Sequence, residues 1–265
     1  MKYFNSDGES GTEQIGNYKI AYLQAIGGRP EQQDCIGFSS LNEEMLVVLC
    51  DGMGGHKGGR LASQVAVEGI LSAYENEETK EYSEQTISDI LCRMDEEISA
   101  LADAEGNKLN AGSTAVVAHF NGRELQFFTL GDSRIYLFSQ NKLTQLSVDM
   151  NYRFLLNNDL STGKITRTEF EQEMIHGEEL ISFLGMGGLA MLQSSERIVL
   201  QSNDKLLLMS DGLYKYVGED TIENVIRNFS NPEEALLALN MNAEMSAKRK
   251  KIGRDNLSVL LINVE

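Results

Sequence analysis

The order of hydrophobic and polar positions along the chain predicts groups of strands separated by pairs of helices. Short apolar runs bounded by Gly, Asn or Asp are typical of strands, and apolar stripes of period near 3.6 are typical of amphipathic helices. We expect strands at residues 18–26, 35–38, 45–50, 113–120, 124–130, 134–139, 196–200, 205–210 and 257–264. We expect helices at residues 61–71, 87–101, 166–174, 219–228 and 233–241. Residues 1–16 are polar and rich in glycine, and we expect them to be poorly ordered.

This order of elements indicates the fold class. Two long helices follow the first strands, many strands come next, and two helices precede the last strand. Asn121-Gly122 between two apolar runs is a strong hairpin signal, so antiparallel pairing dominates and a βαβ dinucleotide-binding fold is excluded. We find no internal repeat and no linker rich in Pro or Ser, which favours a single α+β domain over residues 1–265.

Composition and charge exclude several classes of partner. Hydrophobic residues make up 42% and charged residues 24%, which is ordinary for a soluble globular protein. The formal net charge of −17 disfavours nucleic acid and anionic membranes, because phosphate contact needs clustered Lys and Arg. The basic run at residues 248–251 is isolated, and we interpret it as a solvated loop or helix end. No apolar stretch approaches the roughly 20 residues of a membrane span.

The cysteines and the N-terminus indicate a cellular location. Cys35, Cys50 and Cys92 are an odd set without paired spacing, which argues against a disulfide framework and for a reducing compartment. The first residues contain no apolar segment of the kind found in a signal peptide. We therefore expect a cytoplasmic protein.

Four apolar strands meet an aspartate at one end: Asp51, Asp132, Asp211 and Asp255. Each alone fits an ordinary Asx turn. If several of these strands share a rim, however, their carboxylates converge and repel one another, and a divalent cation relieves the repulsion. An oxygen-only ligand set suits Mg²⁺ or Mn²⁺. Zinc is disfavoured, because the three histidines share no ligand spacing and the chain has no C-x-x-C.

Two further residues suggest contacts with a metal and a phosphate. Gly52 follows Asp51, and without a Cβ its carbonyl could approach a metal closely; the alternative is a flexible loop that leads into a helix. The glycines after it match neither a P-loop nor a dinucleotide fingerprint. Arg29 could bind a phosphate bidentately near such a metal, or could be an ordinary surface arginine.

Six ordered motifs between about residues 16 and 264 resemble the metal-dependent (PPM-type, type 2C) Ser/Thr protein phosphatases, in their bacterial form. The matching segments are Arg29 with Gln33-Asp34, Asp51-Gly52-Met53-Gly54-Gly55-His56, Gly112-Ser113-Thr114-Ala115, Gly131-Asp132-Ser133-Arg134, Ser210-Asp211-Gly212 and Asp255-Asn256. The resemblance implies a central antiparallel β-sandwich flanked by α-helices, in four α-β-β-α layers. It also implies hydrolysis of phosphoserine and phosphothreonine in proteins, the substrates of a Ser/Thr kinase, by a water that two metal ions activate.

The resemblance also implies a role for each site residue. Asp51 would bridge two Mn²⁺ or Mg²⁺ ions, Gly52 would offer its carbonyl, and Asp211 and Asp255 would complete the second ion's ligands. In the same way, Asp132 with Asp211 would hold a weaker third ion, Asp34 would orient the attacking water, and Arg29 would hold the substrate phosphate.

The chain departs from the family pattern at several positions. Gln32 stands where the family usually has Asn, and Met53 stands where eukaryotic members carry a proposed acid histidine. His56 lies three residues later, and we do not transfer that role to it. Asp149-Met150-Asn151 replaces the usual Asp-His-Ser/Thr. The stretch 147–193, a mobile flap in this family, is the least typical, and we expect substrate choice to reside there.

Two other functions stay open at this point. A catalytically silent binding module of the same fold would typically have lost metal carboxylates, and none is lost here. A sigma-factor-regulating serine phosphatase usually lacks the phosphate arginine, so Arg29 counts against it. The sequence names neither the substrate, nor the kinase, nor the oligomeric state.

Overall fold

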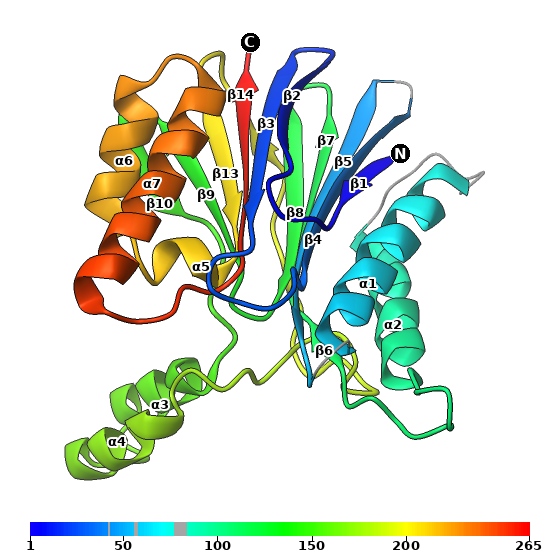
Figure 1. The fold of residues 1–265 in the computed structure, drawn as a ribbon, viewed down its shortest axis with the longest axis vertical. Coiled ribbons are helices and arrows are strands. Elements are labelled where there is room, and N and C mark those ends of the chain that lie inside the picture. The colour runs from blue at the N-terminus through cyan, green and yellow to red at the C-terminus, as the bar shows by residue number, and fades with distance from the viewer. Residues whose placement is uncertain (42, 56–57, 77–83) are drawn as a thin grey trace.

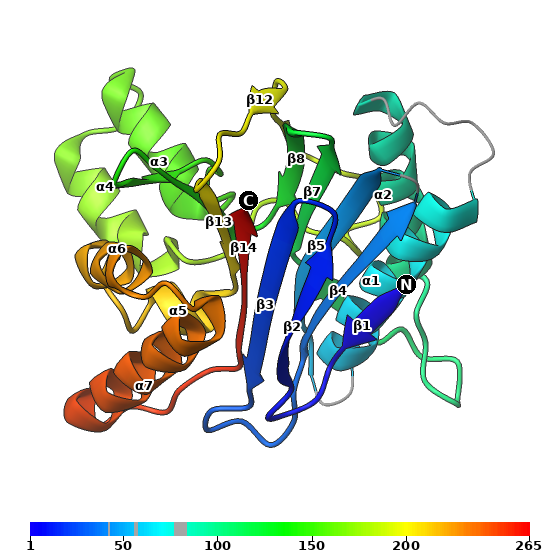
Figure 2. The ribbon, with the colours of Figure 1, turned by 90° about the horizontal axis from the view of Figure 1, so that it is seen from above.

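Two antiparallel β-sheets face each other, and helices cover the outer face of each (Figure 1). The structure is a computed structural model that describes residues 1–41, 43–55, 58–76 and 84–265. Seen from above, the two groups of helices lie on opposite sides of the paired sheets (Figure 2). The expected four-layer α-β-β-α sandwich is confirmed.

The first sheet has the strand order β1-β4-β5-β7-β8-β11, with β6 paired to β5 and β12 to β8. Its strands are β1 (Lys2–Phe4), β4 (Asp34–Leu41), β5 (Glu44–Met53), β6 (Gly112–Ser113), β7 (Ala115–Asn121), β8 (Glu124–Leu130), β11 (Gln193–Ser194) and β12 (Ile198–Val199). Helices α1 (Gly58–Asn76) and α2 (Glu84–Ser99) cover its outer face (Figure 1).

The second sheet has the strand order β10-β9-β13-β14-β3-β2. Its strands are β2 (Ser10–Ile15), β3 (Tyr18–Ala25), β9 (Arg134–Ser139), β10 (Lys142–Gln145), β13 (Lys205–Met209) and β14 (Leu257–Val264). The helices on its outer side are α5 (Asp211–Tyr214), α6 (Glu219–Asn228) and α7 (Pro232–Lys250).

Strand β5 contributes side chains to two hydrophobic cores, one on each face of the first sheet. Side chains on a strand alternate between its two faces. Every second residue from Leu46 to Cys50 therefore packs toward α1 and α2, whereas the intervening residues from Met45 to Leu49 fill the space between the sheets. A third apolar core lies between the second sheet and α5, α6 and α7. The near-continuous hydrophobicity of residues 45–50 reflects this burial on both faces.

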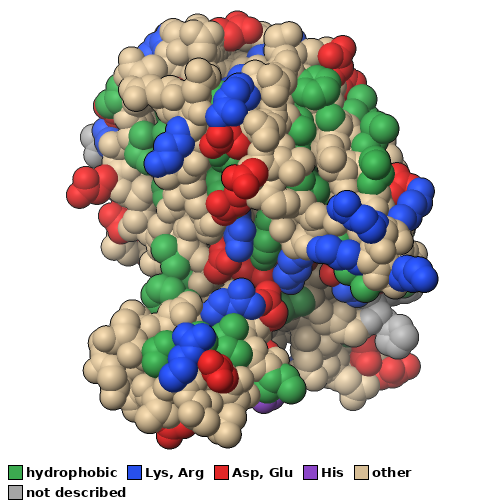
Figure 3. All heavy atoms as spheres, turned by 90° about the vertical axis from the view of Figure 1, so that its left-hand side faces the viewer, with side chains coloured by type: hydrophobic (Ala, Val, Ile, Leu, Met, Phe, Trp, Pro, Cys, Tyr) green, Lys and Arg blue, Asp and Glu red, His purple; other side chains and the backbone are tan. Residues whose placement is uncertain are grey.

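The stretch 147–193 contains helices α3 (Tyr152–Ser161) and α4 (Arg167–Glu173) and the 3-10 turn η1 (Met174–His176). Helices α3 and α4 project from the sandwich at the lower left of Figure 1 and form a separate lobe in Figure 3, whereas Met150 and Leu184 of the same stretch belong to the core beneath α1 and α2. We call residues 147–193 the flap. The flap leaves the body where the Met150 N–H donates to the carbonyl of Gly131 at 2.8 Å. It rejoins the body where Asp95 of α2 accepts hydrogen bonds from the backbone N–H groups of Gly185, Met186 and Gly187.

The N-terminal segment differs from the sequence expectation. Residues 1–16 contain β1 and β2, and β2 pairs with β3 from Ser10↔Leu23 to Ile15↔Tyr18. The expectation of poor order is therefore wrong, because edge pairing with an apolar strand orders a segment whose own composition is polar. Strand propensity alone does not report such pairing.

Other element boundaries differ less. Helix α3 was not predicted, and the strand expected at residues 196–200 reduces to β12. Helix α7 continues to Lys250. The basic run at residues 248–251 therefore lies at the end of a helix, which is one of the two interpretations given above (a solvated loop or a helix end). Among the described helices, none has the length and apolarity needed to cross a membrane.

Candidate metal centre

The space between the two sheets changes from apolar to polar at one end. Asp34 of β4 lies directly opposite Asp51 of β5 in the antiparallel register. Both follow the alternation that points Ile36 and Leu49 into the inter-sheet core, so their side chains belong to the same face. Ser210, which follows β13, donates its hydroxyl to Asp34 Oδ2 at 2.8 Å across this space. The strand pattern itself therefore directs these polar side chains toward one another.

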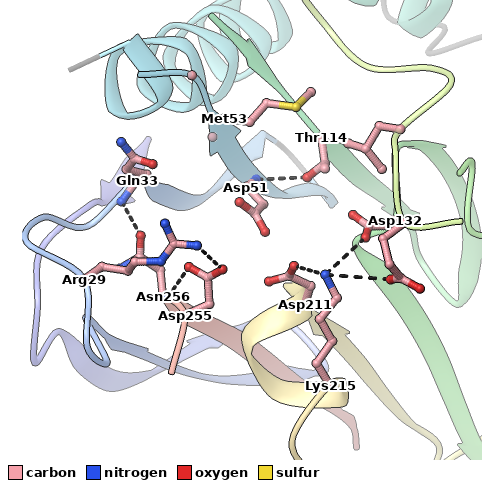
Figure 4. Close-up of a pocket in the computed structure, with 14 residues that line it drawn as sticks. Arg29, Gln33, Asp51, Met53, Thr114, Asp132, Asp211, Lys215, Asp255 and Asn256 are labelled. Carbon is pink, nitrogen blue, oxygen red and sulfur yellow. Dashed lines mark hydrogen bonds and ion pairs between the residues drawn. The ribbon is translucent and has the colours of Figure 1, made fainter. Parts of the chain in front are cut away.

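Beyond this polar layer lies a cavity of about 270 Å³. The described residues that line it are Arg29, Gln33, Asp51, Gly52, Met53, Gly54, Thr114, Asp132, Glu178, Leu180, Asp211, Lys215, Asp255 and Asn256. The carboxylates of Asp51, Asp211 and Asp255 point toward its centre, and Asp132 borders it on the side of Lys215 (Figure 4). All four strand-end aspartates predicted from the sequence thus line one cavity, together with Arg29 and Gly52.

The backbone around Asp51 is held on both sides. Its N–H donates to Thr114 Oγ1 and its carbonyl accepts from the Thr114 N–H, each at 2.9 Å. Gly52 must be glycine for a steric reason, since a Cβ there would lie 2.0 Å from the carbonyl oxygen of Gly59 and 2.6 Å from that of Gln33. Strand β5 can therefore run past the start of α1 at backbone contact distance. This packing supplies a reason for Gly52 that is independent of any metal.

Asp132 sits in the turn between β8 and β9, where Gly131 adopts a φ of +86°. Its Oδ2 accepts a hydrogen bond from the Tyr214 hydroxyl at 2.9 Å. The guanidinium of Arg134 stacks 3.6 Å from the Tyr214 ring centroid and forms two hydrogen bonds with the carboxylate of Asp149. Asp149, at the start of the flap, is thereby connected to the cavity through Arg134 and Tyr214.

Two basic side chains hold the remaining carboxylates. Arg29 Nη2 lies 2.6 Å from Asp255 Oδ2. Lys215 Nζ lies 2.5 Å from Asp211 Oδ2 and 4.0 Å from the nearest oxygens of Asp132 and Glu178. Asp211 begins α5, which places Lys215 four residues later, on the same side of the helical turn.

The loop that carries Arg29 is fastened by Asn256. The side-chain amide of Asn256 donates to the carbonyls of Ile26 and Glu31, and its oxygen accepts from the Gln33 N–H at 2.9 Å. The position of Arg29 is therefore fixed from the strand that follows Asp255. Asn256 belongs to a motif noted in the sequence, but this fastening role was not anticipated.

Asp34 is placed behind the cavity rather than on its wall. Its side chain is 1% exposed, and it is not one of the described residues that line the cavity. Burial raises the pKa of Asp34 to about 7, against the lowering effect of hydrogen bonds from Ser258 and Ser210. The structure does not bring Asp34 to the cavity surface, so any influence on the reacting groups passes through its neighbours.

The other aspartates repel one another in a buried setting. Burial and the charges of Asp34 and Asp211 raise the pKa of Asp51 well above its ordinary value. Burial and the charge of Asp211 raise the pKa of Asp132 to about 6, although Lys215 favours the ionised form. Burial likewise raises the pKa of Asp211. Carboxyl groups with pKa values raised in this way gain from a nearby cation, which stabilises their ionised forms.

The donor set fits a pair of hard divalent ions. Asp211 Oδ1 is buried and has no hydrogen-bond partner among the described residues. Such an orphaned oxygen is costly unless a ligand satisfies it. Over the described residues, no group of three His, Cys, Asp or Glu side chains is placed so that these side chains alone could hold a metal ion. Arg29 and Lys215 lie among these carboxylates and pair with Asp255 and Asp211 (Figure 4). Backbone oxygens and water would supply the further oxygen ligands that Mg²⁺ or Mn²⁺ prefers.

Sequence reasoning missed Lys215, Tyr214 and Glu178. Lys215 carries a readable signal, since it lies four residues after an aspartate already singled out. Glu178 lies in the irregular flap, where no pattern places it at the cavity. Met53 lines the cavity, and His56 lies outside the described residues.

Comparisons with known proteins identify the family and several relatives of this chain. The family Protein phosphatase 2C matches residues 26–247. The chain is 28% identical over 233 residues to the serine/threonine phosphatase stp of Listeria monocytogenes, covering 85% of this chain and 86% of that protein. It is similar to the serine/threonine phosphatase of S. agalactiae, with a TM-score of 0.77 and 25% identity over 94% of this chain and 100% of that one.

The fold is also shared with a protein solved together with metal. The catalytic domain of the phosphatase PstP, in complex with two manganese ions, gives a TM-score of 0.70 at 24% identity, over 93% of this chain and 97% of that one. The family match spans the motifs from Arg29 to Asp211, and the resemblance noted in the sequence is confirmed. The chain belongs to the protein phosphatase 2C family and is a metal-dependent protein phosphatase of the bacterial type.

Proposed function

We propose that the chain hydrolyses phosphoserine and phosphothreonine in proteins, using two Mn²⁺ or Mg²⁺ ions held in the cavity at the end of the sandwich. The observation that carries this proposal is the convergence of four strand-end aspartates and Arg29 on one cavity. Such a site combines a strongly acidic metal-binding wall with one arginine for the substrate.

Asp51, Asp211 and Asp255, together with the carbonyl of Gly52, would hold the two ions. The buried and unpartnered Oδ1 of Asp211 supports this assignment. When bound, such ions supply a nucleophile at neutral pH and neutralise the charge that develops on the phosphoryl group.

Arg29 would bind the substrate phosphate. Its guanidinium lies at the cavity wall, half exposed, with one nitrogen engaged by Asp255. A guanidinium has five N–H donors in a fixed fork, so further donors stay available for two phosphate oxygens. The same ion pair with Asp255 orients the fork toward the cavity.

Asp34 would act as a positioning residue. It is buried directly opposite Asp51 and accepts the hydroxyl of Ser210, the residue before Asp211. Its charge state therefore influences two ligand-bearing segments without contact with the substrate. We therefore propose an indirect role for Asp34, through its neighbours, in place of the direct orientation of the attacking water that the family resemblance implies.

The substrate would be a phosphoprotein generated by a Ser/Thr kinase. Glu178 and Leu180 bring the flap to the cavity, which supports a flap contribution to substrate choice. The three cysteines are unpaired, which supports a reducing compartment such as the cytoplasm.

The test is metal-dependent hydrolysis of a phosphothreonine peptide. We expect turnover that requires Mn²⁺ or Mg²⁺ and that falls by at least about 100-fold in Asp211→Asn, as loss of a metal carboxylate should cause. Asp220→Asn, on the exposed side of α6, is the matched control and should retain activity. Absence of turnover at every metal concentration would refute the proposal, as would full activity of Asp211→Asn.

A further inference from the structure

Lys215 occupies the space between two carboxylates that the family resemblance assigns to a third ion. Its ammonium lies 2.5 Å from Asp211 Oδ2 and 4.0 Å from Asp132 Oδ2. Figure 4 shows the Lys215 side chain extending from the end of α5 and its nitrogen lying between the two aspartates. A charged nitrogen of the chain itself therefore stands where a cation would contact both residues.

The oxygen of Asp132 that faces this space already has a partner. Asp132 Oδ2 accepts the Tyr214 hydroxyl at 2.9 Å, and Arg134 stacks on the Tyr214 ring. A phenol keeps its proton at neutral pH, so the Tyr214 hydroxyl is available as the donor in this contact. Neither aspartate consequently offers an uncommitted Oδ2 to an ion placed between them.

Steric and electrostatic requirements point the same way. A Mg²⁺ ion lies about 2.1 Å from its oxygen ligands, with near-octahedral geometry. An ion at that distance from Asp211 Oδ2 and directed toward Asp132 would overlap the ammonium, because Nζ is itself 2.5 Å from that oxygen. A dication and an ammonium so close together would also repel strongly.

The charge of the cavity is consistent with two ions. Of the described residues that line it, five are acidic and two are basic, which leaves a formal charge of minus three. Two divalent ions reverse this to plus one, suited to a phosphate dianion. A third ion would leave an excess of positive charge in a confined space.

We propose that the Lys215 ammonium takes the place of a third divalent ion between Asp132 and Asp211, so that the protein binds two ions rather than three. The inference rests on the proposed function for the two ions at Asp51, Asp211 and Asp255. It departs from the expectation that Asp132 and Asp211 serve a weaker third ion. The residues at that position do not fit one.

A consequence concerns the flap. Lys215 also lies 4.0 Å from Glu178, which belongs to the flap. The lysine thus joins a carboxylate of the flap to the carboxylates of the sandwich. Metal concentration would not control this connection, because the bridging charge is part of the chain.

The test counts Mn²⁺ ions bound per chain, by titration calorimetry and by metal analysis of the protein equilibrated with millimolar Mn²⁺. We expect two ions for the wild-type protein, two for Lys215→Arg, and three for Lys215→Ala, with the third the weakest. Lys248→Ala is the matched control, because Lys248 forms the same i,i+4 pair with Glu244 on a helix away from the cavity, and it should bind two.

The outcomes distinguish failure of the inference from failure of the proposed function. Three ions in the wild-type protein, or two in Lys215→Ala, overturn the inference and leave the two-ion function intact. No Mn²⁺ bound by the wild-type protein overturns both. If Lys215→Ala fails to fold, the number of Mn²⁺ ions bound by the wild-type protein alone decides whether the inference holds.

Discussion

Asp34 and Asp51 are cross-strand neighbours in the antiparallel pair β4–β5, and both project into the space between the two sheets. Asp34 is the buried member of the pair and Asp51 borders the cavity. Ser210 completes the contact from the opposite sheet. Two buried carboxylates at adjacent positions on one sheet face repel each other, and a proton or a bound cation relieves the repulsion. This relationship links the stability of the protein to its metal content.

The stability of the metal-free protein should decrease as the pH rises toward 7. Burial raises the pKa of Asp34 from 3.8 to about 7, so the native state binds more protons than the unfolded state in this interval. Stability then falls with rising pH, because the sign of the slope follows the protons bound by the unfolded minus the native state. The stabilisation is fully present below pH 4 and lost as the pH passes 7. Urea unfolding at a series of pH values measures it.

Asp34→Asn isolates this contribution from other titrating groups. The variant should be more stable than the wild type, by on the order of a few kcal/mol, above pH 7, and the difference should shrink as the pH falls to 5. A difference that does not vary with pH would contradict the assignment. Saturating Mn²⁺ should reduce the pH dependence of the wild type, since bound cations stabilise ionised carboxylates.

Arg29 should affect catalysis more than metal binding. We expect Arg29→Ala to lower kcat/KM by about 100-fold, which is the usual effect of removing a donor aimed at developing charge. Arg29→Lys should recover part of the loss, because it keeps the charge without the planar fork. Steady-state kinetics with a phosphothreonine peptide and calorimetry with Mn²⁺ separate the two effects.

The control for this prediction is Arg197→Ala, which removes an exposed arginine paired with Glu124 at 3.1 Å. It should change neither kinetics nor Mn²⁺ affinity. If Arg29→Ala weakened Mn²⁺ binding as much as kcat/KM, Arg29 would belong to the metal-binding wall and would not be the phosphate ligand.

Asp95 should stabilise the end of the flap. Its buried carboxylate accepts the backbone N–H groups of Gly185, Met186 and Gly187, two of them at 2.7 and 2.9 Å. Asp95→Ala leaves these donors without their acceptor and should lower the free energy of unfolding by about 2–3 kcal/mol. Hydrogen exchange at residues 185–187 should accelerate.

Asp89→Ala provides the comparison on the same helix. Asp89 is exposed on α2, and its loss should change the free energy of unfolding by no more than about 0.5 kcal/mol. Equal destabilisation by the two substitutions would mean that helix α2, rather than the flap contact, accounts for the effect.

The sequence predicted the sandwich and its metal wall because both follow from strand periodicity. Asp51, Asp132 and Asp211 follow apolar runs and Asp255 precedes one, and strands of one sandwich share a rim. Because all four residues offer only oxygen ligands, they also favour Mg²⁺ or Mn²⁺ over zinc. The convergence itself could be expected from the pattern, although Asp34 was expected at the cavity and lies behind it.

The missing parts depend on contacts between segments far apart in the sequence. The N-terminal strand β2 is ordered by pairing with β3, and Glu178 reaches the cavity only through the fold of the flap. Asp95 is an acidic residue on the buried, otherwise apolar face of α2, and the backbone N–H groups that it accepts from lie about 90 residues later in the chain. Neither propensity nor spacing encodes such contacts.

We propose that Asp51 is the shared ligand of two metal ions in the cavity. The most direct measurement is anomalous diffraction at the manganese edge from crystals grown with Mn²⁺. We expect two manganese peaks in the cavity, both in contact with Asp51, with Asp211 and Asp255 among their other ligands. Absence of manganese from the cavity, or ions that do not contact Asp51, would contradict it.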